Sequence, residues 1–198
     1  MLQLIETICF ENGEFQRIPL HEERMNRSRH SLFGAHEKID LGKLLNIPES
    51  MKDQKVRCRV TYSETIENIE YEPYVYKKIR SLKLVWDDTI DYSFKFRNRD
   101  DLNRLLCLRG SEDEILIVRN GMITDTSFTN IVFLKNETWY TPAFPLLAGT
   151  RRADYLEKKV ILPSIIRPDD LYQYEEARLI NAMRSLEDAE PILVSNIS

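Results

Sequence analysis

Lys95 lies between Phe94 and Phe96, just before a predicted helix, and it is the first residue whose setting could support chemistry. Two aromatic rings can partly desolvate a lysine amine, and desolvation lowers a lysine pKa towards nucleophilic or Schiff-base chemistry. The same pattern fits a solvated lysine, or one whose alkyl chain passes the rings to reach water. Local sequence alone favours this second, structural interpretation.

A second candidate segment follows the tight Asn120-Gly121 turn and is rich in Asp, Ser, Thr and Asn as far as Asn130. Short polar side chains that interrupt a buried sheet must find hydrogen bonds, and a bound ligand could supply them. A loop held by Asx and Ser/Thr turns explains the composition equally well. The segment therefore indicates either a ligand-binding loop or an ordinary polar turn.

A third candidate segment is Gly149-Thr150-Arg151, which opens a predicted helix. Backbone N–H groups at a helix N-terminus, a hydroxyl group and a nearby arginine form an anion site suited to phosphate. Alternatively, Thr150 simply caps the helix, which is the commoner use of this residue type. None of the three segments supports a function by itself.

The elements that must position these segments are mostly strands. In the first part of the chain, strands are predicted at residues 2–10, 15–20, 55–62, 66–76 and 82–86, and helices at 21–34 and 40–45. In the second part, strands are predicted at 114–118, at Ile123, and at 129–134, 138–140, 176–180 and 192–194, and helices at 100–109, 149–160 and 168–171. Because the helices do not alternate strictly with the strands, we expect an α+β or mixed α/β fold. An apolar run breaks near residues 87–92, which predicts a small N-terminal domain at 1–87 and a larger one at 92–198.

The composition excludes several classes of protein. The 198 residues include 28 Lys and Arg against 32 Asp and Glu, which gives a net charge of −4 and argues against nucleic-acid binding. No stretch approaches the roughly 20 apolar residues that span a bilayer, and the N-terminus lacks the pattern of a secretory signal. Three cysteines without a CxxC pair favour a reducing cytoplasm, and with three scattered histidines they argue against a metal site.

Ordered motifs run along nearly the whole chain: IETICFENGEF, HEERMNRS, KFRNRDDLN, GSEDEILIVRNGMITDTSFTNIVF, PAFPLLAGTRR and LINAMRSLEDAEPI. Together they resemble the fold-type IV (class IV) aminotransferases that use pyridoxal phosphate. This family includes D-amino-acid and branched-chain aminotransferases and aminodeoxychorismate lyase. The resemblance implies a two-domain fold of the D-amino-acid aminotransferase type. We expect its N-terminal domain to be shortened, because the chain begins at a strand that an N-terminal hairpin normally precedes.

The resemblance also implies a role for each matched residue. Lys95 would form the internal aldimine with pyridoxal 5'-phosphate and then move a proton between the substrate and the cofactor. Arg24 would bind the cofactor phosphate as a planar cation. The other phosphate-binding residues would be Gly149, Thr150, Asn181 and Ala182. Asp125 stands where the family usually has a glutamate, and it would pair with the ring nitrogen and keep it protonated.

Substrate recognition is implied for the strand at residues 55–62. In the D-amino-acid enzymes, an arginine near the end of this strand holds the substrate carboxylate. That position corresponds to Tyr62 here, and Arg57 and Arg59 lie at alternating positions before it. One of the two arginines could take that role, or both could be residues of the sheet surface.

The activity that the resemblance implies is transfer of an amino group between an amino acid and a 2-oxo acid, by a homodimer. The first alternative is a lyase of the aminodeoxychorismate type, which would use the same lysine and release pyruvate. The second is a family member that keeps the fold without turnover, an alternative suggested by the shortened N-terminal domain and by the aspartate at position 125.

Overall fold

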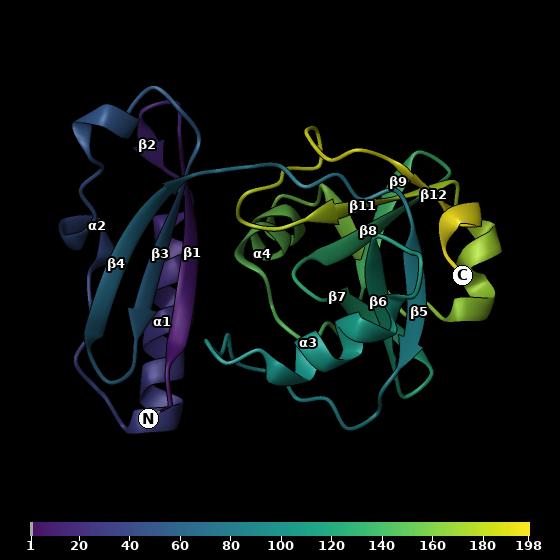
Figure 1. The fold of residues 1–198 in the computed structure, drawn as a ribbon, viewed down its shortest axis with the longest axis horizontal. Coiled ribbons are helices and arrows are strands. Elements are labelled where there is room, and N and C mark those ends of the chain that lie inside the picture. Colours follow the sequence, from purple (N-terminus) through teal and green to yellow (C-terminus); the bar gives the residue numbers. More distant parts are fainter. Residues whose placement is uncertain (1) are drawn as a thin grey trace. The chain divides into compact units, whose positions relative to one another are not determined.

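The computed structural model describes residues 2–198 and divides them into two compact units (Figure 1). Unit 1 contains the described residues as far as Tyr76, together with Phe94–Asn98. Unit 2 contains Lys77–Ser93 and Arg99–Ser198. The chain therefore enters unit 2 earlier than the break near residues 87–92 suggests, and it returns once to unit 1 with the segment that carries Lys95.

Unit 1 is a four-stranded antiparallel sheet with the order β2-β1-β3-β4, and helix α1 packs against one of its faces (Figure 1). Its elements are β1 (Leu4–Glu11), β2 (Glu14–Phe15), α1 (Ile18–Phe33), α2 (Leu41–Leu44), a 3₁₀ turn (Glu49–Met51), β3 (Val56–Tyr62) and β4 (Ile66–Pro73). Alternate residues of β1 and β3, among them Leu4, Ile8 and Val60, pack with Met25 of α1 in the core. This alternation gives the sheet one face towards α1 and one face away from it.

The strand predicted at residues 15–20 is wrong beyond Phe15. Arg17 adopts a left-handed conformation, with a φ of 56°, and this reverses the chain. Pro19 then lies in the first turn of α1, where its fixed φ favours a helix and its missing N–H costs no hydrogen bond. As a result, α1 begins at Ile18, three residues before the predicted start, and ends at the predicted glycine, Gly34.

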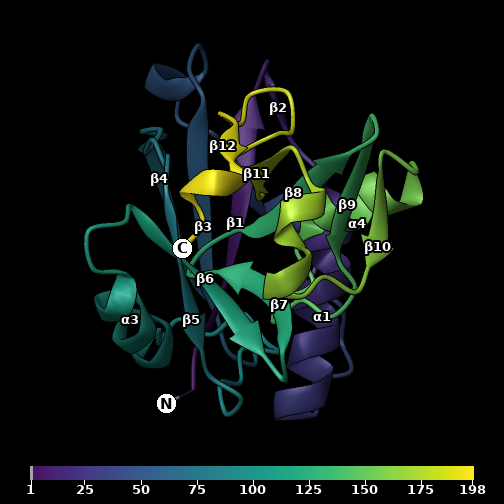
Figure 2. The same cartoon turned by 90° about the vertical axis from the view of Figure 1, so that its right-hand side faces the viewer.

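Unit 2 is built on a mixed sheet with the strand order β10-β9-β8-β7-β6-β5, and β11 pairs with both β8 and β12. Its elements are β5 (Leu82–Trp86), α3 (Asp100–Leu106), β6 (Glu114–Arg119), β7 (Met122–Thr126), β8 (Asn130–Lys135), β9 (Thr138–Pro142), α4 (Thr150–Glu157), β10 (Ile161–Ser164), β11 (Glu176–Ile180), β12 (Ile192–Leu193) and 3₁₀ turns at Cys107–Arg109, Pro168–Gln173 and Val194–Asn196. Helix α3 lies beside β5 and β6, and α4 lies near β9 and β10 (Figure 2).

Strand β5 has the predicted bounds, but it pairs with unit 2 and not with the first part of the chain. It runs parallel to β6, with Leu82 opposite Glu114. Parallel strands need a long crossover connection, and here the crossover includes residues 94–98 and α3. Local sequence identifies the strand but carries no signal for a partner that lies across such a connection.

The segment around Lys95 extends the sheet of unit 1. Leu4 and Phe96 form an antiparallel bridge, and the Ile5 N–H donates to the Lys95 carbonyl at 2.9 Å. The rings of Phe94 and Phe96 both pack against the core between the sheet and α1. The Phe96 N–H donates to the Phe94 carbonyl at 2.9 Å, so the chain turns tightly at Lys95. Because the rings on both sides of Lys95 pack towards α1, we infer that the Lys95 side chain leaves on the face away from α1.

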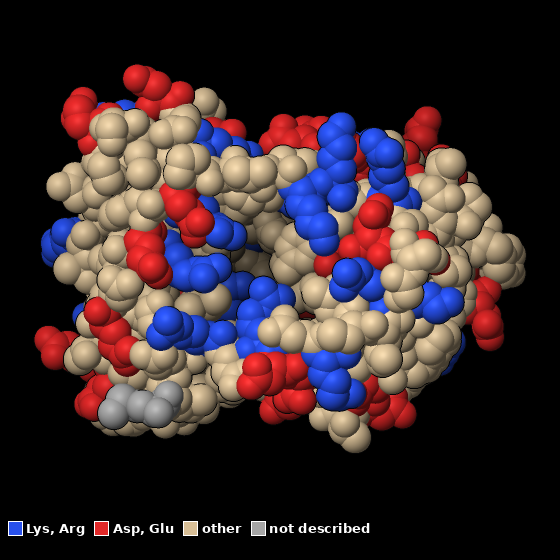
Figure 3. Space-filling view, viewed as in Figure 1, with Lys and Arg blue, Asp and Glu red and all other residues tan. Residues whose placement is uncertain are grey.

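No helix in the described part of the chain is long and apolar enough to cross a membrane. Within residues 2–198, no three His, Cys, Asp or Glu side chains gather in a way that could hold a metal ion. Acidic and basic side chains both occur on the visible surface of each unit (Figure 3).

Candidate functional site

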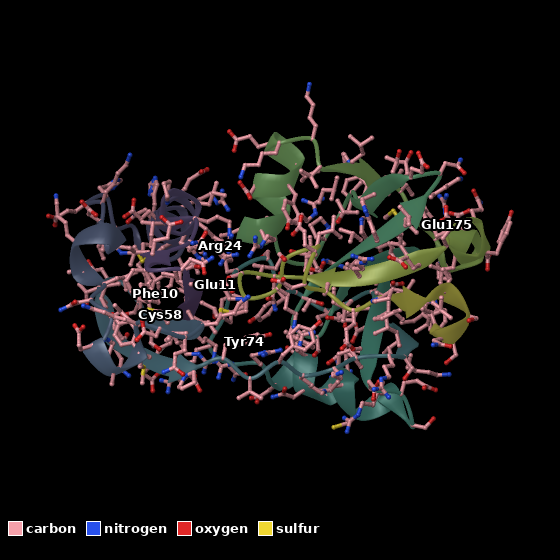
Figure 4. The ribbon with its side chains drawn as sticks, turned by 90° about the horizontal axis from the view of Figure 1, so that it is seen from above. Phe10, Glu11, Arg24, Cys58, Tyr74 and Glu175 are labelled. Carbon is pink, nitrogen blue, oxygen red and sulfur yellow. The ribbon has the colours of Figure 1, made fainter. Side chains whose placement is uncertain are left out.

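Arg24 is held in unit 1 by a buried carboxylate that the sequence analysis did not single out. The Arg24 Nε and Nη2 groups donate to the two oxygens of Glu6 at 2.8 and 2.5 Å. His21, one helical turn before Arg24, places its Nδ1 2.6 Å from Glu6 Oε2. Glu6 and His21 are fully buried, and Arg24 is 7% exposed. Arg24 comes from α1, and Phe10 and Cys58, labelled with it in Figure 4, come from the strands of the same unit.

The charges of this Glu6 cluster (Glu6, His21 and Arg24) are balanced. Burial by itself would raise the Glu6 pKa, but the charge of Arg24 and the hydrogen bonds from His21 and Arg24 outweigh it and lower the pKa to about 2. Burial lowers the His21 pKa despite the nearby carboxylate, so a neutral His21 donates its Nδ1 proton. The bidentate contact with Glu6 therefore fixes the orientation of the Arg24 guanidinium group.

The three candidates for substrate binding fall on two different faces of the sheet. In the register of β1 and β3, Arg59 lies opposite Thr7 and Thr61 lies opposite Ile5. Ile5 is also the residue whose N–H bonds the Lys95 carbonyl. By alternation, Arg57 and Arg59 therefore share the face of Lys95. Arg57 is engaged with Glu72 at 2.7 Å, whereas the Arg59 Nε is buried and has no hydrogen-bond partner among the described residues.

Tyr62 lies on the other face, in the core beneath α1, and is fully buried. Burial and the charge of Glu6 both raise the pKa of its hydroxyl group. A β-bulge separates Thr61 from Tyr62, but the ring still packs with the residues that face α1. The structure thus groups Tyr62 with the Glu6 cluster and not with the two arginines.

Asp125 is a buried carboxylate in unit 2 that is held by amide groups. It lies on β7 directly opposite Asn130 of β8, and the Asn130 Nδ2 group donates to Asp125 Oδ1 at 2.8 Å. The Leu147 N–H donates to the other oxygen, Oδ2, at 2.9 Å. Burial raises the Asp125 pKa to about 6, because the hydrogen bonds and the charge of Arg152 only partly offset the loss of hydration.

The N-terminus of α4 carries Gly149 and Thr150. Gly149 is the residue before the first helical turn, and no side chain caps this end of the helix. The first N–H groups of a helix have no partner within it, so an uncapped end is suited to an anion. Thr150 is 4% exposed, and its position in the first turn agrees with the prediction of a helix start at this point.

Asn181 and Ala182 lie next to this helix start. They follow β11 in a turn in which Asn181 and Arg184 exchange two backbone hydrogen bonds of 3.2 and 3.1 Å. The Arg151 Nε and Nη2 groups donate to the carbonyl groups of Asn181 and Ala182 at 3.3 and 3.4 Å. The structure therefore brings the predicted phosphate-binding residues of unit 2 into one neighbourhood.

The sequence analysis missed two contributors, Glu6 and the particular role of Asn130, whereas Arg151 was already part of the predicted anion site. Glu6 is an acidic residue inside an apolar strand, which is a recognisable signal of a buried partner. Asn130 is the last residue of the polar segment that follows the Asn120-Gly121 turn, but the sequence gives no sign that its role differs from that of the other polar residues there. Of the predicted residues, Arg24, Lys95, Arg57, Arg59 and Tyr62 belong to unit 1, and Asp125, Gly149, Thr150, Asn181 and Ala182 belong to unit 2.

Comparisons with known proteins identify the family of this chain. The model of the family described as Amino-transferase class IV matches residues 3–188. A protein of Haemophilus influenzae named only "uncharacterized protein" is 38% identical over 188 residues, which make up 94% of this chain and 100% of that protein.

Two solved structures show the same fold. That of a "putative 4-amino-4-deoxychorismate lyase" from Haemophilus somnus has a TM-score of 0.87 and 39% identity, over 94% of this chain and 98% of that chain. A hypothetical aminotransferase from Mycobacterium tuberculosis, in its PLP-bound form, has a TM-score of 0.75 and 16% identity, over 96% of this chain and 80% of that chain. These matches confirm the mixed α/β fold that the sequence predicted.

Proposed function

Because this chain belongs to the class IV aminotransferase family, we propose that it is a pyridoxal-phosphate-dependent enzyme that moves an amino group between an amino acid and a 2-oxo acid. The residues present fit this cofactor. The uncapped N-terminus of α4 suits a phosphate group, Asp125 is a buried acid, and Lys95 supplies a primary amine. Pyridoxal phosphate, when bound, supplies an electron-withdrawing ring that stabilises negative charge at the substrate α-carbon.

The position of Lys95 is the observation that carries the proposal. Phe94 and Phe96 anchor the segment in the core on the α1 side, and a backbone hydrogen bond ties it to Ile5. Because both neighbouring rings pack on the α1 side, we infer that the Lys95 amine is directed to the opposite face of the sheet. In the proposed reaction, this amine binds the cofactor and later carries a proton to and from the substrate α-carbon.

Asp125 would hold a proton at the ring nitrogen of the cofactor. With a pKa of about 6, the carboxylate is mostly ionised at neutral pH, and a nearby positive charge would lower this pKa and make the ionisation complete. A protonated ring nitrogen supplies that charge, so the acid and the ring would stabilise each other's charged forms. Arg24, Gly149, Thr150, Asn181 and Ala182 would bind the phosphate.

We place the substrate carboxylate at Arg59, and not at Arg57 or Tyr62. Arg59 shares the face of Lys95 and has a buried Nε with no hydrogen-bond partner in residues 2–198, whereas Arg57 is already paired with Glu72. We expect Arg59→Ala to raise KM by about 10- to 100-fold, because a hydrogen-bonded ion pair with the substrate is lost. Arg57→Ala is the matched control and should change KM little. Equal effects of the two substitutions would contradict the assignment.

The proposal is tested first by adding pyridoxal phosphate to the purified protein and recording its absorbance before and after borohydride treatment. We expect a visible band near roughly 410–420 nm, and reduction should leave a pyridoxyl group on Lys95 in a peptide map. Lys95→Ala should abolish the band. Lys43→Ala, which changes an exposed lysine paired with Asp40, should not. A folded protein with no band would favour the non-catalytic alternative.

The second candidate function is a lyase of the aminodeoxychorismate type, favoured by the similarity to the Haemophilus somnus protein. The two reactions differ in stoichiometry. An aminotransferase supplied with an amino acid alone stops after one turnover per site and resumes when a 2-oxo acid is added. A lyase turns over repeatedly with its single substrate and releases pyruvate. Pyruvate that accumulates in excess of the enzyme, from 4-amino-4-deoxychorismate alone, would decide for the lyase.

We also propose a homodimer in the cytoplasm. Among the described residues, Cys9, Cys58 and Cys107 form no disulfide bond, as is usual for cysteines in a reducing compartment. The dimer is what the family resemblance implies, and sedimentation of the active protein tests it. A monomer with full activity would contradict it.

A further inference from the structure

The side chain of Asn130 links two parts of the candidate site in unit 2. Its Nδ2 group donates both to Asp125 Oδ1 at 2.8 Å and to the Leu147 carbonyl at 2.9 Å. The Leu147 N–H in turn donates to Asp125 Oδ2. Asn130 and Asp125 are 6% and 5% exposed, so little water can replace these bonds. The carboxylate, the amide and one peptide unit thus form a closed set of hydrogen bonds.

The other end of the same amide lies against Gly149. A Cβ atom at position 149 would be 2.0 Å from Asn130 Oδ1, which is far inside any allowed contact. The φ of Gly149 is −70°, which every residue type can adopt, so its backbone conformation does not require glycine. Space is the only reason for glycine that the structure shows, and the Asn130 amide takes up that space.

We propose that Asn130 is a positioning residue that couples the orientation of the Asp125 carboxylate to the N-terminus of α4. This inference rests on the proposed function, in which Asp125 meets the ring nitrogen and α4 meets the phosphate group. One amide then sets the relative positions of the groups that hold the two ends of the cofactor. Gly149 is part of this coupling, because only a residue without a Cβ leaves room for the Asn130 amide beside it.

The coupling has a signature in the protein without cofactor. The hydrogen bond from Asn130 stabilises the ionised form of Asp125, so its loss should raise the Asp125 pKa further. Asn130→Ala removes the bond directly. Gly149→Ala should have the same effect indirectly, because the new methyl group displaces the amide. In a protein that already carries Asn130→Ala, the amide is absent, so the methyl group of Gly149→Ala should have no further effect on Asp125.

The experiment is a double-mutant cycle of Asn130→Ala and Gly149→Ala in the full chain. The Asp125 titration is followed by carboxyl NMR without cofactor, and the affinity for pyridoxal phosphate by absorbance. We expect each single substitution to raise the Asp125 pKa and to weaken cofactor binding by about 10- to 100-fold. In the Asn130→Ala background, adding Gly149→Ala should change neither quantity by more than about twofold.

Gly42→Ala is the matched control, because a Cβ there would lie 3.3 Å from a carboxylate oxygen of Asp40. It should leave the Asp125 titration unchanged. If Asn130→Ala does not fold, Asn130→Ser replaces it. Independent effects of the two substitutions, or an unchanged Asp125 titration, would overturn the coupling. If the wild-type chain binds no pyridoxal phosphate, the proposed function fails, and the coupling is judged by the titration alone.

Discussion

Glu6 in unit 1 and Asp125 in unit 2 are both buried carboxylates, yet their environments shift the pKa in opposite directions. Glu6 accepts hydrogen bonds from a guanidinium group and an imidazole, and its pKa falls to about 2. Asp125 accepts hydrogen bonds from a side-chain amide and a backbone N–H, and its pKa rises to about 6. Burial disfavours the charge in both cases, so the difference lies in the donors.

The comparison separates a structural carboxylate from one that is ready to meet a cation. Glu6 already has its positive charge in Arg24, and its pKa of about 2 keeps it ionised at neutral and mildly acidic pH. The positive charge of Arg152 acts on Asp125, but its guanidinium donates hydrogen bonds to Thr141 and to the Pro142 carbonyl. A charged ligand group would therefore gain more at Asp125 than at Glu6.

The largest expected effect is that of Glu6→Gln. It leaves the buried Arg24 without its counter-charge, and we expect the free energy of unfolding at neutral pH to fall by about 3–5 kcal/mol. Urea denaturation measures this change. The control is Glu11→Gln on the same strand, which weakens a partly exposed pair with Lys55 and a long contact from the Cys9 thiol and should cost less than about 1 kcal/mol. If Glu6→Gln also lowers the free energy of unfolding by less than about 1 kcal/mol, the Glu6 cluster contributes no more to stability than an exposed ion pair does.

The next effect is a pH dependence that Asp125→Asn should remove. The Asp125 pKa is about 6 in the folded chain, and its ordinary value, which applies to the unfolded chain, is 3.8. Between pH 3.8 and about 6 the folded chain binds the proton more tightly, so the free energy of unfolding falls as the pH rises. We expect the stability of the wild type relative to Asp125→Asn to fall by about 2–3 kcal/mol over this range. Denaturation at a series of pH values measures it.

Asp101→Asn, at a largely exposed aspartate, is the control and should show no such trend. Glu6 supplies the opposite trend in the same wild-type curve. Its stabilisation is complete above its ordinary pKa of 4.5 and is lost as the pH falls towards about 2. If the wild type instead gains stability relative to Asp125→Asn as the pH rises, the Asp125 pKa is lowered by a positive charge and the contrast with Glu6 is wrong.

Arg24→Lys gives the smallest of the three effects. A lysine keeps the positive charge but cannot make the bidentate contact with both oxygens of Glu6, so we expect a loss of about 1–2 kcal/mol in unfolding free energy. Urea denaturation measures it beside Arg27→Lys, an exposed arginine of the same helix, which should be neutral. An Arg24→Lys protein as stable as the wild type would show that charge alone, without geometry, stabilises the Glu6 cluster.

The sequence by itself determined the family, most of the elements and the identity of the candidate residues. Strands β5 and β11 and the start of α3 lie at the predicted residues, because periodicity and flanking turn residues are local signals. It also predicted a helix at 149–160, but α4 ends at Glu157 and Lys159 has a φ of 56°. Helix ends are weakly encoded, since the last turn makes few hydrogen bonds.

Only the tertiary structure decided which side chains meet. Alternation along β3 separates Arg59 from Tyr62, but the packing of α1 decided which of the two faces is covered. Likewise, Glu6 with Arg24 and Asn130 with Gly149 are pairs of residues far apart in sequence. Hydrophobic patterns specify which residues are buried, whereas hydrogen bonds and steric contacts depend on distances of a few tenths of an ångström between separate elements. Those distances exist only once the elements have packed.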